Sequence, residues 1–247
     1  MEKQNAFDRL SFFILSAKKF NERIQSINRQ LTPLGISYSF VFGHDVTDLG
    51  FNPPILSLNN STILTLPELS IITKHVLAWH RGIRSGREYV LILEDDAILD
   101  PCFVQKLKIV LSQIEELKPG FLVNLGGANA RVPLGFYRDK NFFYRLRMGT
   151  SEAYISDRLA MERRLSWLEK NCVDLPADHM ICHIDSQVGN DHWWLKEAIV
   201  EQGSLSGAFK SRLDQGRASR NRLLLKFSYE SKKFRRRTLK RWIAYVF

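Results

Sequence analysis

An aliphatic run at residues 89–93 is followed directly by three acidic residues, Glu94, Asp95 and Asp96. Two carboxylates about 4 Å apart repel by roughly 4 kcal/mol at an effective dielectric near 20, so the cluster is costly unless a cation binds there. Carboxylate oxygens suit Mg²⁺ or Mn²⁺, and such an ion can bridge the phosphates of a nucleotide. The alternative is that an aspartate caps the next helix and the glutamate is solvated.

The three acids are expected to differ in role. By analogy with the last acid of Asp-x-Asp motifs, Asp96 is predicted as a metal ligand. Side chains alternate along a strand, which places Glu94 on the same side as Asp96. We expect Glu94 to bind the metal, directly or through water, or the ribose of a donor. Asp95 then points to the other side of the strand, and it is assigned to binding the nucleotide and not the metal.

Histidines supply further candidates, because imidazole is both a common metal ligand and a general base. His179, His183 and His192 lie in a region expected to face the acidic cluster, and His192 is predicted as a metal ligand. His75 and Trp79 are four residues apart on one helical face and are predicted to line a ligand pocket. Structural or solvated histidines, and a tryptophan in the core, are the alternatives.

The elements that must position these residues follow from hydrophobic periodicity. The order strand, helix, strand across residues 10–16, 19–34 and 36–42 predicts a β-α-β opening and a parallel sheet. Further strands are predicted at 88–93, 121–125 and 151–155, and helices at 66–85, 103–117 and 157–171, with Asp157 as an N-cap. Ligand sites in such sheets gather at the carboxyl ends of the strands, where the acids lie.

Charge divides the chain of 247 residues into two parts. Residues 208–247 carry 13 Lys/Arg and 2 Asp/Glu, and they alternate with Leu, Phe, Trp and Tyr. We therefore predict a catalytic domain at 1–207 and a basic amphipathic tail at 208–247 that binds an anionic membrane surface. A terminal helix packed on the body with a solvated basic face is the alternative. The near-neutral body argues against a nucleic-acid groove.

Other features bear on the compartment. Cys102, Cys172 and Cys182 show no zinc-site spacing and are read as reduced thiols. The N-terminal apolar run is too short for a signal peptide, and no run reaches the roughly 18 apolar residues of a membrane span. We expect a cytoplasmic protein, peripheral on the inner-membrane face.

A series of motifs in order resembles glycosyltransferase family 25, the lipooligosaccharide β-galactosyltransferase-like enzymes. The resemblance spans about residues 12–211, with departures at Pro67, Ser70, Ile71 and Lys74. The matching segments are Pro67–Trp79, Leu93–Ala97, Phe121–Gly127, Ser151–Ser156, Leu175–Asp178 and Ala198–Ser204.

This resemblance implies a GT-A type fold, in which a mixed and mainly parallel sheet is flanked by helices. The basic tail, read from its composition, is expected to be helical. It implies transfer of a hexose, most simply galactose from UDP-galactose, with inversion, to a lipooligosaccharide or lipopolysaccharide core acceptor. Asp178 matches the aspartate of the family's Pro-Val-Asp motif and is predicted as the general base, with Asp185 in reserve. Capping of a helix by Asp178 is the alternative.

Five further residues are predicted to bind the donor. Gln202 and Ser204 resemble the end of the family's donor site, and Ser16 is placed there as well. Arg23 is predicted to reach the donor phosphates from the first helix, unless it lies on a solvated face. Gly126 is predicted to let the backbone approach the sugar, unless it forms a simple turn. A metal-dependent nuclease that uses the acidic triplet and the basic tail remains the alternative function.

Overall fold

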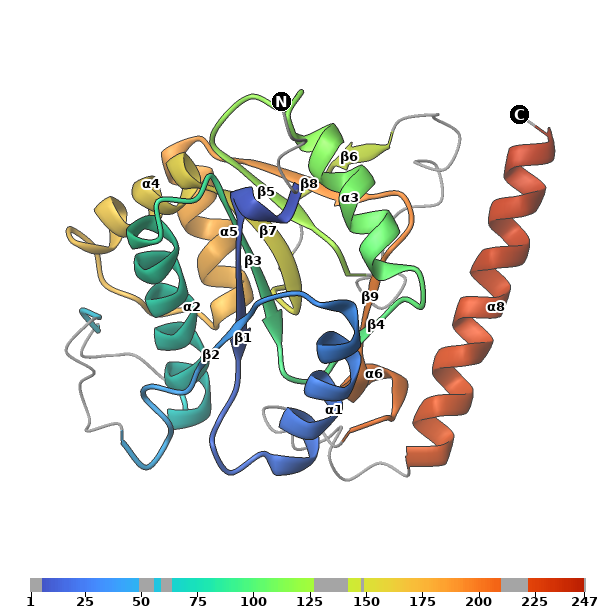
Figure 1. Cartoon of the computed structure of the whole chain (residues 1–247), viewed down its shortest axis with the longest axis horizontal. Helices are drawn as coiled ribbons and strands as arrows, with labels where there is room; N and C mark the ends of the chain where they lie inside the picture. Colours follow the sequence, from blue (N-terminus) through green and yellow to red (C-terminus); the bar gives the residue numbers. More distant parts are fainter. Residues whose placement is uncertain are drawn as a thin grey trace.

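The computed structural model describes residues 6–48, 56–58, 64–126, 142–147, 149–209 and 222–246. Within these residues, a seven-stranded sheet has the order β2-β1-β3-β7-β5-β8-β6 (Figure 1). Its strands are β1 Leu10–Leu15, β2 Ser39–Val41, β3 Tyr89–Glu94, β5 Phe121–Asn124, β6 Phe143–Arg145, β7 Ala153–Asp157 and β8 Asp191–Leu195. Five strands point the same way, while β6 and β7 run antiparallel to their neighbours. The predicted mixed, mainly parallel sheet is confirmed.

Two short strands and a set of helices complete the described fold. The strands β4 Ala97–Leu99 and β9 Val200–Gln202 form a separate antiparallel pair. The helices are η1 Ala6–Arg9, α1 Asn21–Leu31, η2 Thr32–Leu34, α2 Leu66–Arg84, α3 Phe103–Ile114, α4 Arg158–Leu168, α5 Ala177–Val188, α6 Gly203–Ser206 and α8 Arg222–Val246.

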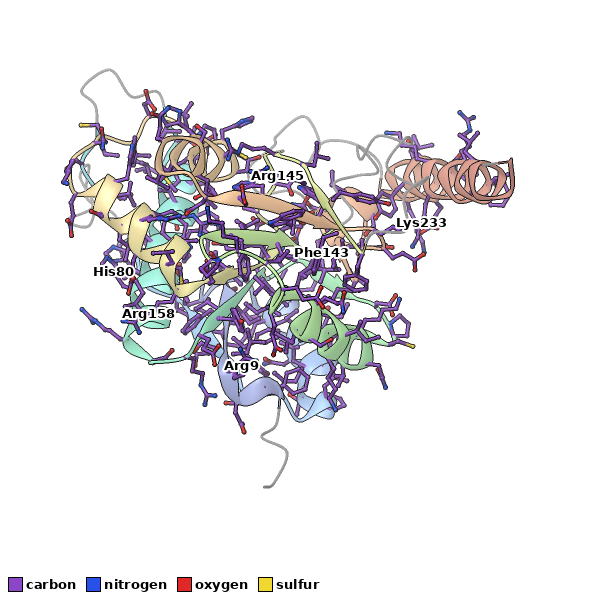
Figure 2. All side chains as sticks on the ribbon, turned by 90° about the horizontal axis from the view of Figure 1, so that it is seen from above. Arg9, His80, Phe143, Arg145, Arg158 and Lys233 are labelled. Carbon is purple, nitrogen blue, oxygen red and sulfur yellow. The ribbon has the colours of Figure 1, made fainter. Side chains whose placement is uncertain are left out.

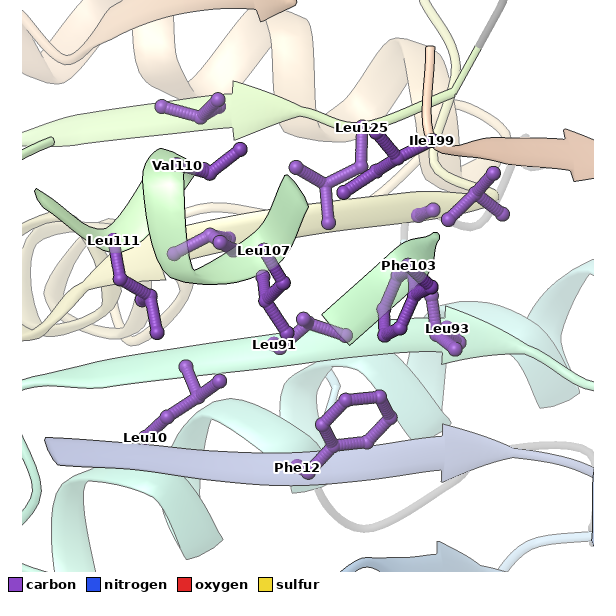
Figure 3. Packing of buried hydrophobic residues seen from close by; sticks show 14 of the residues in the cluster. Leu10, Phe12, Leu91, Leu93, Phe103, Leu107, Val110, Leu111, Leu125 and Ile199 are labelled. Atoms are coloured by element: carbon purple, nitrogen blue, oxygen red, sulfur yellow. The ribbon is translucent and has the colours of Figure 1, made fainter. Parts of the chain in front are cut away.

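Helices cover both faces of the sheet, and strand alternation divides the core accordingly. Leu91 and Leu93 of β3 pack into one cluster with α1 and α3, whereas Val90 and Ile92 pack into another with α2, α4 and α5. Figure 3 shows the first cluster, in which Phe103 of α3 lies over the strands. Because β3 is buried on both faces, it reads as a continuous aliphatic run.

The first predicted helix is shorter than its periodicity implies. The prediction of 19–34 becomes α1 and the 3₁₀ turn η2, because Pro33 lacks the amide that would continue the α-helix. Gly35 then ends the turn in the left-handed region at φ 65°. The helix at 66–85 is confirmed, and Thr65 starts it with a capping box to Glu68.

The N-cap prediction for Asp157 is also confirmed. Its carboxylate accepts the Ala160 amide at 3.2 Å and the amides of Gly120 and Phe121 at 2.8 and 2.9 Å. One side chain therefore ties the start of α4 to the start of β5. The strand predicted at 151–155 begins two residues later, as β7, and runs antiparallel to β3.

The predicted basic tail forms α8, which lies along the edge of the domain beside α6 (Figure 1). Residues 210–221 lie outside the described part, so the boundary at 207 stays a prediction. Among the described residues, no helix is both long and apolar enough to cross a bilayer. All three cysteines are free thiols.

Candidate active site at the carboxyl edge of the sheet

The parallel strands β1 and β3 bring the acidic cluster to the carboxyl edge of the sheet. The Asp95 amide donates to the Leu15 carbonyl at 3.1 Å, and the Glu94 amide donates to the Glu152 carbonyl at 2.9 Å. Asp95 and Asp96 are buried, with exposed fractions of 4% and 2%, whereas Glu94 is partly buried. Little solvent therefore screens the charges of the three adjacent acids.

Asp95 already has a compensating partner. Its carboxylate accepts a hydrogen bond from Ser16 Oγ at 2.7 Å and forms an ion pair with Arg23 Nη1 at 2.7 Å. Burial raises the pKa of Asp95, while the Arg23 charge and the Ser16 hydroxyl oppose that rise. Ser16 and Arg23 thus lie at the cluster as predicted, and in this structure they hold Asp95. Their contact with a donor stays a prediction.

Asp96 is held in place but keeps one oxygen without a partner. Its Oδ2 accepts the Ser204 amide at 3.0 Å, and its backbone carbonyl accepts the Gly203 amide at 2.8 Å. Its Oδ1 is buried and makes no hydrogen bond. A buried carboxylate oxygen without a donor is costly, and a bound cation would satisfy it. Ser204 therefore lies at the site through its backbone, and Gln202 precedes it at the end of β9.

Glu94 is the acid of the cluster whose negative charge its surroundings disfavour. It accepts a hydrogen bond from Ser151 Oγ at 3.1 Å, and its pKa is raised well above the ordinary value. Burial is the largest cause, followed by the charges of Asp96, Glu152 and Asp95. Glu94 and Asp96 are thus electrostatically coupled, as expected for two acids that share one side of a strand.

Sequence reasoning missed Glu152, a fourth acid with an exposed fraction of only 4%. It precedes β7, whose start meets the carboxyl end of β3 because the two strands are antiparallel. Its carboxylate also fills the space beside Gly126, where an added Cβ would lie 2.1 Å from Glu152 Oε1. The missing side chain of Gly126 therefore makes room for Glu152, and the approach of its backbone to a sugar stays a prediction. Gly127 lies outside the described residues.

The residues present fit a divalent cation of the magnesium type. In the described part of the chain, no group of three or more His, Cys, Asp or Glu side chains is arranged to hold a metal ion. Mg²⁺ is commonly held by one or two carboxylates together with substrate phosphates and water. Asp96, with its free buried oxygen, and Glu94 would supply the protein's share of such a site.

A cavity of about 220 Å³ opens beside the cluster. Its wall combines apolar side chains with cations, hydroxyls and the acids Glu94 and Asp95. The lining residues are Leu15, Ser16, Ala17, Lys19, Phe20, Arg23, Val46, Pro67, Ser70, Ile71, Lys74, Glu94 and Asp95. All four positions at which the chain departs from the family pattern line this cavity. A pocket with apolar walls and a few polar groups is typical of a small-molecule site.

Lys74 belongs to the cavity wall and was not among the predicted site residues. Its ammonium is buried and contacts Asp45 Oδ1 at 2.5 Å and Ser70 Oγ at 3.0 Å. Asp45 also accepts the Lys18 amide at 3.0 Å, and Ser70 donates to the His44 carbonyl at 2.7 Å. The pair therefore fixes the loop after β2 against α2. No regular pattern in the sequence connects positions 45 and 74.

Asp178 lies in the first turn of α5 and is partly exposed. The next residue, His179, packs against Gly149, where an added Cβ would lie 3.2 Å from its Nδ1. Ser151, two residues after Gly149, donates to Glu94. Asp178 therefore lies at the same edge of the sheet as the acidic cluster, on the first turn of the helix and not as its cap.

The prediction of Asp185 as the reserve general base is wrong. Asp185 is fully buried and accepts bonds from Arg164 Nε and Nη2, both at 2.7 Å, and from His192 Nε2 at 2.5 Å. Burial alone would raise the pKa of Asp185, but the Arg164 charge and the His192 bond hold it well below the ordinary value. An acid that binds a proton so weakly and does not reach solvent is a structural ion pair, not a base.

His192, the predicted metal ligand, is also placed elsewhere. His192 of β8 lies in one row across the sheet with Leu122 of β5, Ser156 of β7 and Val90 of β3, because each pairs with the next in register. Val90 precedes Glu94 by four residues, so His192 lies about 13 Å along the strand direction from the cluster. His192 instead completes the buried network around Asp185. The prediction failed because the register of β8 could not be read from the sequence.

His75 and His183 do not line an open ligand pocket. His75 is fully buried and bonds through Nδ1 to the Tyr154 hydroxyl at 3.0 Å, which also accepts from Trp79 Nε1 at 2.9 Å. Burial, followed by the charge of Arg164, lowers the pKa of His75 to about 3. His75 and Trp79 are therefore core residues. His183 is exposed and packs edge-on against Trp167, away from any acid of the cluster.

Comparison with known proteins adds the family. The sequence model for glycosyltransferase family 25, described as an LPS biosynthesis protein, matches residues 10–171. The chain belongs to glycosyltransferase family 25. The match includes the acidic cluster, Arg23 and Glu152, while Asp178, Gln202 and Ser204 lie beyond it. Family membership decides for a glycosyltransferase over the alternative nuclease, and it implies a nucleotide-sugar donor and a glycan acceptor.

Similar solved structures are distant from this family 25 chain. A glycosyltransferase involved in glycosylation of the major capsid of PBCV-1 is 10% identical, with a TM-score of 0.44 and coverage of 90% of this chain and 99% of that one. A protein from STIV is 14% identical (TM-score 0.41, coverage 78% and 83%). Mannose-1-phosphate geranyltransferase from Thermus thermophilus is 10% identical (TM-score 0.40, coverage 86% and 80%). A search of curated protein sequences finds no significant match. The functional conclusion therefore rests on the family and on the site.

Proposed function

We propose that this enzyme transfers a hexose, galactose from UDP-galactose, with inversion to a lipooligosaccharide or lipopolysaccharide core, and that it requires Mn²⁺ or Mg²⁺. One observation carries the metal requirement. Asp96 keeps a buried oxygen without a hydrogen-bond donor, next to Glu94, whose pKa is raised by burial and by its acidic neighbours. A divalent cation and a diphosphate together compensate such a cluster.

The cavity beside the cluster supports the donor assignment. Phe20 and Ile71 offer apolar surface for a nucleobase, and Arg23 offers positive charge close to the acids. Asp96 and Glu94 would hold the cation, which when bound supplies charge stabilisation for the departing diphosphate. Arg23 would add to that stabilisation from the Asp95 side of the cavity, as predicted for the donor phosphates.

Asp178 is proposed as the general base. It takes the proton from the acceptor hydroxyl, and the hydroxyl oxygen forms a bond to the anomeric carbon. The bond from that carbon to the donor phosphate breaks, and the nucleoside diphosphate leaves with the electron pair. Attack from the face opposite the leaving group inverts the configuration. The partly exposed position of Asp178 in the first turn of α5, at the same edge as Glu94, supports this role.

The acceptor places the reaction at a membrane. Lipopolysaccharide precursors carry a lipid anchor and anionic groups, so we propose that the enzyme works in the cytoplasm, peripherally on the inner-membrane face. The basic residues of α8 support this location, because each Lys or Arg near an anionic surface contributes about 1 kcal/mol.

A donor screen tests the function. Purified protein is incubated with a panel of nucleotide sugars, with Mn²⁺ or with EDTA, and the released nucleotide is measured. We expect slow hydrolysis of UDP-galactose that needs the metal and is lost in Asp96→Asn but kept in Glu116→Gln, an exposed acid just beyond the end of α3. Metal-independent hydrolysis, or equal hydrolysis in the Asp96 variant, would contradict the proposed mechanism. Hydrolysis of another sugar nucleotide alone would correct the donor.

A further inference from the structure

Helix α8 has one side that contacts the catalytic domain. Lys233 Nζ pairs with the Glu201 carboxylate of β9. Burial and the same Glu201 carboxylate raise the pKa of the Tyr229 phenol, four residues earlier on the same helical face. Residues of α8 also contact α6. In Figure 2, α8 projects from the edge of the domain, and Lys233 lies where the helix meets the body.

The opposite side of α8 is apolar and exposed. Leu224, Phe227 and Phe234 have exposed fractions of 68%, 76% and 71%. At 3.6 residues per turn, their spacings of three and seven residues place them in one stripe, about 150° around the helix from Tyr229 and Lys233. We call these three residues the apolar stripe. Soluble surfaces rarely present two neighbouring phenylalanines with no cover, so the stripe marks an interaction surface.

We propose that α8 lies flat in the surface of an anionic phospholipid bilayer, with the apolar stripe inserted among the lipids and its basic residues at the headgroups. The helix carries nine Lys/Arg and one Glu in 25 residues. Lys226, Lys232 and Arg235 are exposed. At 100° per residue, Arg235 lies beside the stripe, whereas Lys226 and Lys232 lie further around the helix. An amphipathic helix with aromatic residues on one side and a strong basic charge is the form that lies in the plane of a membrane interface.

The same charge argues against a second copy of the chain as the occupant of the stripe. Two α8 helices packed along their stripes would bring 18 positive charges together against two acids. Like charges across an interface oppose association. Anionic headgroups instead attract each of those Lys and Arg side chains. Charge complementarity therefore favours the bilayer.

Docking α8 in this way would bring the membrane close to the acidic cluster. Glu201, which pairs with Lys233, is one residue before Gln202, and the Gly203 and Ser204 amides that follow hold Asp96. The helix thus packs on the same short segment that fixes the candidate metal ligand. This part of the inference rests on the proposed function, since it is the lipid-anchored acceptor that gains access.

Vesicle binding tests the proposal without donor or acceptor, so its outcome is independent of the glycosyltransfer reaction. The full-length protein is sedimented with vesicles of phosphatidylethanolamine and phosphatidylglycerol, and with vesicles of phosphatidylcholine alone. We expect binding to the anionic vesicles, weakened about tenfold or more by the double variant Phe227→Ser and Phe234→Ser. The matched control is Ile109→Ser, which removes a side chain 51% exposed on α3, and it should bind like the wild type.

A second readout follows the stripe directly. The fluorescence emission of the tryptophan added in Phe227→Trp should shift to shorter wavelength when anionic vesicles are present. The emission of the tryptophan added in Ile109→Trp should not shift. Unchanged vesicle binding by the double serine variant, with its helix content intact by circular dichroism, would overturn the proposal. So would equal binding to phosphatidylcholine, or a wild-type dimer in solution that the serine variant dissociates without any vesicle binding by either protein.

Discussion

Replacing Glu94 by glutamine tests the electrostatic cost of the acidic cluster. Burial and the charges of Asp96, Glu152 and Asp95 raise the pKa of Glu94 above its ordinary 4.5. Without a metal, the folded protein therefore binds this proton more tightly than the unfolded chain does. The contribution of Glu94 to the free energy of unfolding is fully present below pH 4.5, and it is lost as the pH rises from there through the raised pKa of the folded state.

The size of the effect follows from this difference in proton affinity. Each tenfold difference in proton affinity is worth about 1.4 kcal/mol, so removing the charge should stabilise the metal-free protein at neutral pH by on the order of 1 kcal/mol. For a chain of this length, that corresponds to a rise of about 2–4 °C in Tm. Saturating Mn²⁺, at about 100 times its Kd, should raise the wild-type Tm by about 5–10 °C, because it contributes about 2.7 kcal/mol.

The assay is thermal unfolding followed by circular dichroism, in EDTA and in Mn²⁺, for the wild type, Glu94→Gln and the control Glu116→Gln. We expect the Glu94 variant to melt higher than the wild type in EDTA and to gain less from Mn²⁺. The Glu116 variant should behave as the wild type in both buffers. If Glu94→Gln melts lower in EDTA, the cluster is not under repulsion and the reasoning fails.

Three further outcomes are expected. Arg164→Met should lower the free energy of unfolding by about 3–5 kcal/mol in urea, because it leaves the buried Asp185 carboxylate without its cation. Arg158→Met removes only the exposed ion pair with Glu162 and should cost under about 0.5 kcal/mol. Equal losses would contradict the buried network. Gly126→Ala should destabilise the fold by about 1–3 kcal/mol in thermal unfolding, since its Cβ meets a buried glutamate, and Gly43→Ala, with only ordinary contacts, is the control that should change little. Asp178→Asn should lower kcat about 10²- to 10⁴-fold with donor binding unchanged by calorimetry, and a variant of full activity would exclude Asp178 as the base.

Local patterns in the sequence were sufficient to predict the central strands and the place of the acids at their ends. The aliphatic run before Glu94 predicted β3 because a strand buried on both faces has no polar positions. Asp157 and the helix from residue 66 followed from capping chemistry, which depends on neighbours within four residues. The placement of the acids at the carboxyl edge of the sheet followed from the same β-α-β logic.

The errors arose where position depends on long-range register. Glu152 joins the cluster only because β7 runs antiparallel to β3. No sequence pattern near residue 152 predicts the direction of that strand. His192 and Asp185 were assigned to the site because they are close to Asp178 in the chain. In space, α5 carries Asp185 two turns away from the edge where Asp178 lies, into a pair with Arg164 of α4. Spacing along a chain does not fix such contacts.

The claim that a divalent cation compensates the acidic cluster can be tested by titrating Mn²⁺ into the protein with UDP present and following the free ion by electron paramagnetic resonance. If the cluster binds the ion, the free signal should be lost at one equivalent for the wild type and for Glu116→Gln, with binding at least about tenfold weaker in Asp96→Asn. Equal Mn²⁺ binding by the Asp96 variant, or none by the wild type, would contradict it.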